Sequence, residues 1–278
     1  MVINRTVLAI LAVGLTTAVM TSACQKKAGL PEGQQSQKLE ATQSKFPDIV
    51  GEAPAPQGKV DQKAVQAIQS MSKYLSSFPK LQWETTGTMD VVTADGQRIQ
   101  MDGSATYQVK RPGFVIKYVS DQKSRNFYYD GKQFTIYSPK IGYFATVPAP
   151  ATNREVFDTV YNRYGIRLPL EDLFRWNDSN DQRIENFKAA YDLGTVMLDG
   201  VKTTHYAFRE PDVDWEVWIQ DGDKPLPLKL SIVDRTDPAR PAFTTRIKWS
   251  PNPTFADRDF TFVPGKGAMK IGLAQFKG

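Results

Sequence analysis

The sequence predicts a mainly β (α+β) fold: a curved antiparallel sheet of about 11 strands forming a half-barrel, closed by an N-terminal helix and a helical insert. Two observations predict the sheet. Asp-Gly pairs, which suit tight hairpin turns, recur at residues 95–96, 102–103, 130–131, 199–200 and 221–222. The segments between them alternate with a period of two, as in VDWEVWI at residues 213–219. Because so many strands do not pack well as a small flat sheet, we expect the sheet to curl.

The N-terminus predicts export. Residues 7–20 form an apolar run that follows Arg5, too short to span a bilayer and typical of a secretory signal. The small residues at 21–23 precede Cys24 as in a bacterial lipobox, although Thr21 stands where that pattern usually has Leu. We therefore predict a lipoprotein signal peptide over residues 1–23 and lipidation of Cys24. The alternative is plain cleavage before Cys24, which would leave a free thiol.

The residues after the signal predict a membrane-anchored domain. Two or three acyl chains on Cys24 would hold the protein stably at a membrane, where one chain binds only marginally. Gln25, in place of Asp, favours the outer over the inner membrane in the enterobacterial sorting pattern. Residues 24–60 are rich in Gln, Gly, Pro and Lys and predict a flexible tether. Residues 61–278 are then the folded domain.

The domain begins with a helix and a first block of strands. Asp61 is a candidate N-cap for a helix that runs to about Phe78, where Pro79 stops it. The period then changes to two. The strands predicted in this block are residues 81–92, 97–109, 113–120, 125–129, 133–138 and 142–147.

A helical insert and a second block of strands follow. Thr152 and Glu155 form a candidate capping box, and Gly165 is a natural end for that helix. Residues 168–174 predict a second short helix and residues near 184–187 a third. The later predicted strands are residues 191–198, 201–209, 213–220, 227–234 and 242–249, with a further one at 259–262.

Three short segments of the sequence resemble those of a known family. They are FYYDGK (127–132), RLPLEDL (167–173) and PDVDWEVWI (211–219), the last followed by PLP at 225–227. The family is an uncharacterised group of predicted periplasmic proteins, labelled a domain of unknown function, and the resemblance covers roughly residues 60–272. Its fold is similar to that of the lipoprotein localisation factors, LolA-like and LolB-like, whose open half-barrel receives acyl chains. The resemblance implies this fold and a lipid or acyl chain as partner. Because the fold also occurs in periplasmic regulators, an envelope-stress sensor or protein-interaction module with a packed interior remains the alternative.

The apolar face of the sheet and its helical cover are the predicted ligand site. Large apolar residues fill a core by default, and the sequence does not separate a lined cavity from a packed one. The predicted lining residues are Phe114, Ile116, Tyr118, Phe127, Tyr129, Phe134, Ile136, Phe157, Val160, Trp215, Val217 and Ile219.

The sequence predicts no enzyme, no catalytic residue, no metal and no cofactor. His205 is the only histidine, whereas zinc sites need three or four ligands. Asp214 and Glu216 share a strand face and are the best candidates for acid–base chemistry, but solvent-facing acids on an amphipathic strand are ordinary. The net charge of +5 comes from dispersed basic residues, so nucleic acid is not expected. The predicted partners are a lipid, the membrane through the anchor and, in the alternative, an envelope protein.

Overall fold

The computed structural model describes residues 58–175 and 186–276. The predicted signal peptide, Cys24 and most of the predicted tether lie outside the described residues, as does part of the predicted third helix. Val60, one residue before the predicted start of the domain at residue 61, already forms a parallel bridge with Ala190.

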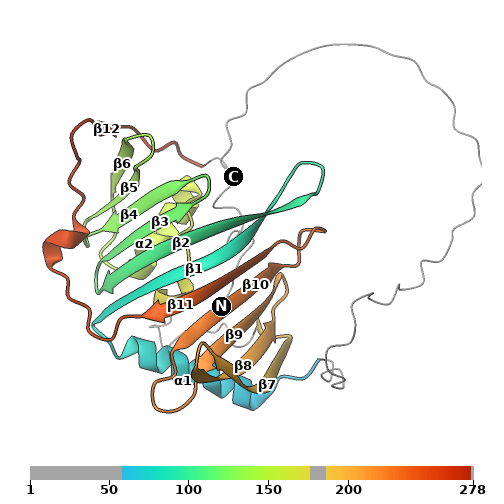
Figure 1. Cartoon of the computed structure of the whole chain (residues 1–278). Coiled ribbons are helices and arrows are strands. Elements are labelled where there is room, and N and C mark those ends of the chain that lie inside the picture. Colours follow the sequence, from blue (N-terminus) through green and yellow to red (C-terminus); the bar gives the residue numbers. More distant parts are fainter. Residues whose placement is uncertain (1–57, 176–185, 277–278) are drawn as a thin grey trace, which may run out of the picture. The chain divides into compact units, whose positions relative to one another are not determined.

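The strands form one open, curved sheet, which confirms the predicted fold class (Figure 1). Their order is β12-β6-β5-β4-β3-β2-β1-β11-β10-β9-β8-β7, and every neighbouring pair is antiparallel except β12–β6. The two edge strands do not pair, so the sheet does not close. The strands are β1 (Lys80–Val92), β2 (Arg98–Lys110), β3 (Phe114–Ser120), β4 (Ser124–Tyr129), β5 (Gln133–Ser138), β6 (Tyr143–Pro148), β7 (Ala189–Leu198), β8 (Val201–Arg209), β9 (Val213–Gln220), β10 (Pro227–Asp234), β11 (Ala242–Trp249) and β12 (Met269–Lys270).

The two edges of the sheet are built differently. At one edge, the short β12 from the C-terminal segment pairs with β6. At the other edge, the pairing of β7 with β8 shifts register between Asp192 and Thr195, where Gly194 has a φ of 88°. Such a bulge bends the strand and interrupts its ladder.

The first helix, α1 (Gln62–Ser76), forms where the sequence predicts it. Asp61 caps its N-terminus by accepting a hydrogen bond from the backbone N–H of Lys63 at 2.8 Å. The helix ends two residues before the predicted Phe78. Its apolar stripe is buried and consists of Ala64, Val65, Ile68, Met71 and Leu75.

The insert contributes α2 (Asn153–Tyr164), and Thr152 caps its N-terminus as predicted, while Glu155 contacts the Thr152 hydroxyl instead of the backbone N–H that a capping box uses. The Thr152 hydroxyl accepts from the backbone N–H of Glu155 at 3.3 Å and donates to its carboxylate at 2.8 Å. Gly165 ends the helix with a φ of 65°, a left-handed conformation that glycine adopts without a steric penalty.

Thr152→Ala is expected to lower the free energy of unfolding by about 1 kcal/mol, because α2 loses its side-chain cap. Thr152→Ser is the matched control, since its hydroxyl can keep both hydrogen bonds. Chemical denaturation of the two variants measures the difference. Equal stability of the alanine variant and the wild type would contradict the assigned cap.

Two local predictions are corrected by the structure. The second short helix is only α3 (Asp172–Arg175), because Leu170 has a φ of 53° and interrupts the predicted turn. The Asp102-Gly103 pair lies within β2, inside the strand predicted over residues 97–109, and the β1–β2 hairpin is closed at residues 95–96. Residues 259–262 are not a strand; they overlap the 3-10 helix η3 (Asp257–Phe260).

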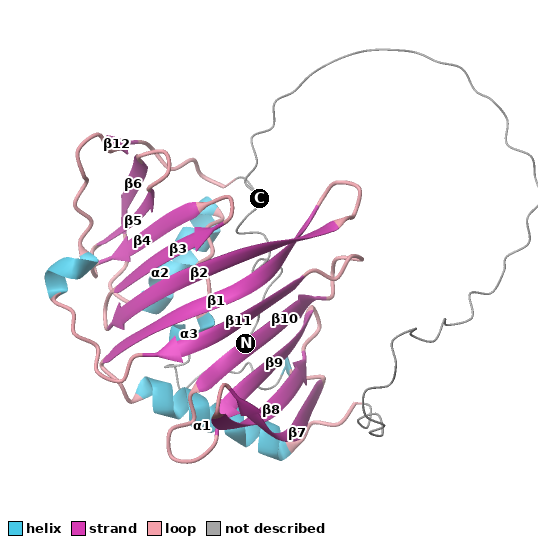
Figure 2. Cartoon of the chain, in the orientation of Figure 1, coloured by secondary structure: helices cyan, strands magenta, loops and turns pink. Residues whose placement is uncertain are grey.

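The main core lies between one face of the sheet and the helices. We call this side the inner face and define it by Trp83 and the residues paired with it. Trp83 is fully buried between Tyr107 and Trp249, with ring centroids 4.6 and 5.0 Å away. Helices α2 and α3 lie behind the sheet in the view of Figure 2 and join this core through residues such as Phe157 and Phe174. None of the helices in the described part of the chain is long and apolar enough to cross a membrane.

A smaller core covers part of the outer face. Phe255 and Phe260, from the segment that follows β11, pack against Val115 on β3. The sheet is therefore covered on both sides near β3, as its partly apolar outer face predicts.

Candidate functional site

Side chains on the inner face become smaller from one cross-strand row to the next. The three successive rows that cross β2, β1 and β11 are Tyr107–Trp83–Trp249, Ala105–Thr85–Ile247 and Gly103–Gly87–Thr245. Stacked aromatic rings fill the first row. The next two rows have too little side-chain volume to fill the same depth, so space remains above them.

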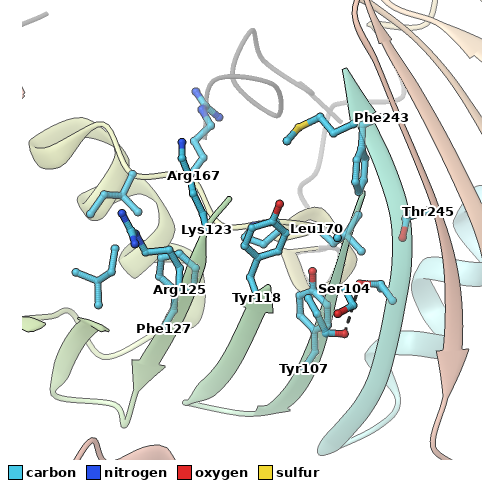
Figure 3. Close-up of a pocket in the computed structure, with 18 of the residues that line it drawn as sticks. Ser104, Tyr107, Tyr118, Lys123, Arg125, Phe127, Arg167, Leu170, Phe243 and Thr245 are labelled. Carbon is cyan, nitrogen blue, oxygen red and sulfur yellow. Dashed lines mark hydrogen bonds between the residues drawn. The ribbon is translucent and has the colours of Figure 1, made fainter. Parts of the chain in front are cut away.

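A cavity of about 300 Å³ lies over these rows (Figure 3). Small residues of both rows line it, and larger side chains from neighbouring strands form its walls, among them Tyr118, Phe127 and Phe243. Tyr164 at the end of α2 and residues 165–167, 169 and 170 after it complete the lining together with Leu273 from the C-terminal segment. The volume is at the lower end of the range for ligand pockets, so the cavity has room for a small apolar ligand or one chain.

The packing of β1 against β11 requires glycine at position 87. A Cβ atom at this position would lie 2.2 Å from the carbonyl oxygen of Thr244 and 2.8 Å from Cα of Thr245. Both are backbone atoms of β11, which could give way only by moving the strand. Gly87 pairs with Gly103 across the β1–β2 ladder, so two residues without side chains face each other beside the cavity. Glycine within a strand often marks such a bend or close approach.

Three basic residues contribute to one part of the cavity wall: Lys123, Arg125 and Arg167. Lys123 lies in the β3–β4 turn, Arg125 on β4 and Arg167 in the segment after α2. In Figure 3 they lie on one side of the pocket, whereas Phe243 and Thr245 lie on the other. The cavity therefore has a cationic side and an apolar side.

The structure divides the predicted ligand residues into two groups. Tyr118, Phe127 and Ile136 line the cavity. The other nine are not among its lining residues and are buried in the main core: Phe114, Ile116, Tyr129, Phe134, Phe157, Val160, Trp215, Val217 and Ile219.

Aromatic packing, partly by helix residues and partly between strands, covers residues of this second group. Phe157 of α2 stacks on Phe114 with ring centroids 5.3 Å apart, and Phe174 of α3 lies 5.2 Å from Phe157. Towards the β7 edge of the sheet, Trp215 of β9 stacks on Phe208 of β8, with ring centroids 4.2 Å apart. The inner face is therefore solid there, and the hollow lies where the side chains are small.

The lining residues that the sequence did not indicate include the small ones, the basic ones and several apolar ones such as Met89 and Leu273. Thr85 and Gly87 alternate along β1, and Gly103 and Ala105 alternate along β2. Two adjacent predicted strands that both carry small residues on the same face would have indicated a hollow. The basic residues gave no such signal, because Arg167 lies far along the sequence from Lys123 and Arg125.

The predicted candidates for chemistry lie outside the cavity lining. The carboxylate of Asp214 pairs with Arg209 at 2.7 Å and Arg240 at 3.0 Å. His205 Nε2 lies 2.7 Å from the carboxylate of Glu216. In residues 58–175 and 186–276, no group of three or more His, Cys, Asp or Glu side chains is placed to hold a metal ion. These side chains therefore pair with one another on the wetter face of the sheet.

The chain is therefore a mainly β protein with an open, curved sheet. Helices lie over its inner face, and a largely apolar cavity lies between the helices and the sheet. Its strands, insert and cavity all fall within one stretch of matched sequence. The chain belongs to the family described as "Predicted periplasmic protein (DUF2092)", whose model matches residues 64–274. This match confirms the family resemblance. No curated protein matches the sequence significantly.

Several solved structures are similar to this chain. An uncharacterised conserved protein from Thermus thermophilus is 11% identical, with 76% of this chain and 99% of that chain covered and a TM-score of 0.45. The lipoprotein LppX from Mycobacterium tuberculosis is 13% identical over 70% of this chain and 98% of that chain, with a TM-score of 0.44. A LolA superfamily protein from Nitrosomonas europaea is 10% identical over 70% and 97%, with a TM-score of 0.27. At these levels the likenesses carry no conclusion about function.

Proposed function

We propose that this chain is a periplasmic protein that binds a lipid or an acyl chain in its cavity and does not alter it chemically. The observation that carries the proposal is the cavity of about 300 Å³ over the small-residue rows. Apolar side chains such as Phe127, Ile136 and Phe243 supply most of its wall. Cavities lined in this way bind apolar groups readily, because water gains few hydrogen bonds inside them.

The proposal includes the N-terminal segment. Cleavage before Cys24 and lipidation of that residue would anchor the protein, with the outer membrane favoured. Residues 24–60 would tether the cavity domain to the membrane surface, within reach of membrane-derived ligands. The periplasmic description of the family supports this location. A role in envelope lipid or lipoprotein trafficking follows from such a placement.

Affinity is expected to rise with the length of the acyl chain, by about fourfold per methylene until the cavity is full. The reason is that each buried methylene contributes about 0.8 kcal/mol. The measurement is displacement of a fluorescent fatty acid from the full chain by a saturated series from hexanoate to palmitate. Affinities that do not depend on chain length would count against the proposal.

The cavity favours ligand binding over the alternative of a sensing or interaction module with a packed interior. Native mass spectrometry of gently purified full chain separates the two functions. A copurifying lipid supports the carrier function. Its absence, together with no binding in the displacement series, supports the interaction module.

A further inference from the structure

The basic side of the cavity wall is held in place by its surroundings. Arg125 Nη1 donates a hydrogen bond to the backbone carbonyl of Ser124 at 3.1 Å and another to the hydroxyl of Ser138. The backbone N–H of Lys123 donates to the Ser120 hydroxyl at 3.1 Å, which fixes the turn. The side chain of Arg125 and the backbone of Lys123 are therefore both held in place by neighbouring residues.

Arg167 is held by an aromatic ring and has an unused donor. Its guanidinium carbon lies 3.5 Å from the ring centroid of Tyr161, a cation–π contact. Its Nε atom is buried and has no hydrogen-bond partner among the residues that the structure describes. A buried donor without a partner is unfavourable, and an acceptor on a bound molecule would relieve it.

The three cations also lack a counter-charge. Within residues 58–175 and 186–276, none of them forms an ion pair with a carboxylate, whereas other arginines and lysines of the sheet do, such as Arg209 with Asp214 and Lys110 with Asp257. Burial lowers the pKa of Lys123, and the charge of Arg125 lowers it further. Burial also lowers the pKa of Arg125. Burial thus disfavours the positive charge of Lys123 and Arg125, and a bound anion would stabilise that charge.

We propose that the ligand is a single-chain amphiphile with an anionic head, a carboxylate or a phosphate, which binds Lys123, Arg125 and Arg167. This inference rests on the proposed function. Arginine presents a planar fork of donors that matches the oxygens of both head groups. The tail runs over the small-residue rows towards Phe243 on β11. Four strand spacings separate β4 from β11, roughly 19 Å along the sheet, and the modest cavity volume favours one chain over two.

The test compares three ligands of equal tail length: palmitate, hexadecyl phosphate and hexadecanol. Wild-type full chain is expected to bind at least one of the anions about tenfold or more tightly than hexadecanol. Preference for palmitate identifies a carboxylate head, and preference for hexadecyl phosphate identifies a phosphate head. Either preference supports the proposal.

Charge-removing variants locate the head group. Arg125→Gln, Lys123→Gln and Arg167→Gln are each expected to weaken anion binding about tenfold and to leave hexadecanol binding unchanged. Arg125→Lys, which keeps the charge, is expected to recover part of the affinity. The matched control is Lys117→Gln, because Lys117 is exposed on the outer face of β3. Unchanged hexadecanol binding also shows that a variant is folded.

Two results separate failure of this inference from failure of the proposed function. Equal affinity of wild type for hexadecanol and both anions would overturn the anionic-head assignment and leave acyl-chain binding intact. A uniform loss for all ligands in the glutamine variants would overturn it as well. Absence of binding for all three ligands to the wild type would overturn the proposed function itself.

Discussion

Ala105→Trp is expected to weaken acyl-chain binding by at least about tenfold. Ala105 lies on the inner face between Thr85 and Tyr118, and all three line the cavity. An indole at this position would occupy the space above the small-residue rows and leave no room for a chain. Displacement titration of the full-chain variant with palmitate measures the effect.

Thr106→Trp is the matched control for this substitution. Thr106 is the next residue on β2, and it is exposed on the opposite face. The same side chain at this position is expected to leave palmitate affinity within about twofold of the wild type. Thermal unfolding of both variants checks that the fold is kept, because overfilling an interior can lower stability by about 1–3 kcal/mol. Unchanged palmitate binding by folded Ala105→Trp would exclude this cavity as the ligand site.

Gly87→Ala is expected to produce a large loss of stability from the addition of one methyl group. The new Cβ atom would overlap the backbone of β11, with the Thr244 carbonyl oxygen only 2.2 Å away. Because β1 and β11 join the two halves of the sheet, moving either strand disturbs the rows on both sides. We expect the free energy of unfolding to fall by about 3 kcal/mol and the melting temperature by about 6–12 °C.

Gly265→Ala provides the control, since no atom lies within 4 Å of a Cβ atom built there. Its stability is expected to stay within about 0.5 kcal/mol of the wild type. Chemical denaturation and thermal unfolding of both variants measure the contrast. If the two alanine variants were equally stable, the close approach of β11 to Gly87 would be contradicted.

The sequence was informative wherever structure depends on neighbouring residues. Asp61 and Thr152 cap the helices that they precede, and Gly165 ends the second of these helices. The period of two located most of the strands to within two residues. Such signals are local, because a turn or a cap is decided by a few adjacent side chains.

Local signals failed where a distant strand decided the outcome. Gly103 lies within the strand predicted over residues 97–109, but nothing near it in the sequence indicates that it faces Gly87 across the ladder. The row that contains these glycines is completed by Thr245, more than 150 residues after Gly87. Which part of the inner face is hollow depends on this long-range register, and no short window of sequence contains it.

The aromatic residues illustrate the same limit. Phe114 and Tyr118 share one face of the same strand, and the sequence treats them alike. The structure buries Phe114 under Phe157 of α2, whereas Tyr118 lines the cavity. The difference is made by the helices, which cover one part of the face and not the other.

The contrasting borders of the sheet have a consequence for the protein in solution. A sheet that does not close normally exposes ladders of backbone groups that invite edge-to-edge polymerisation with other molecules. Here β12 occupies part of one border, and the kink at Gly194 breaks the regularity of the other. The molecule can therefore keep the hollow of an unclosed sheet without offering a continuous template for aggregation.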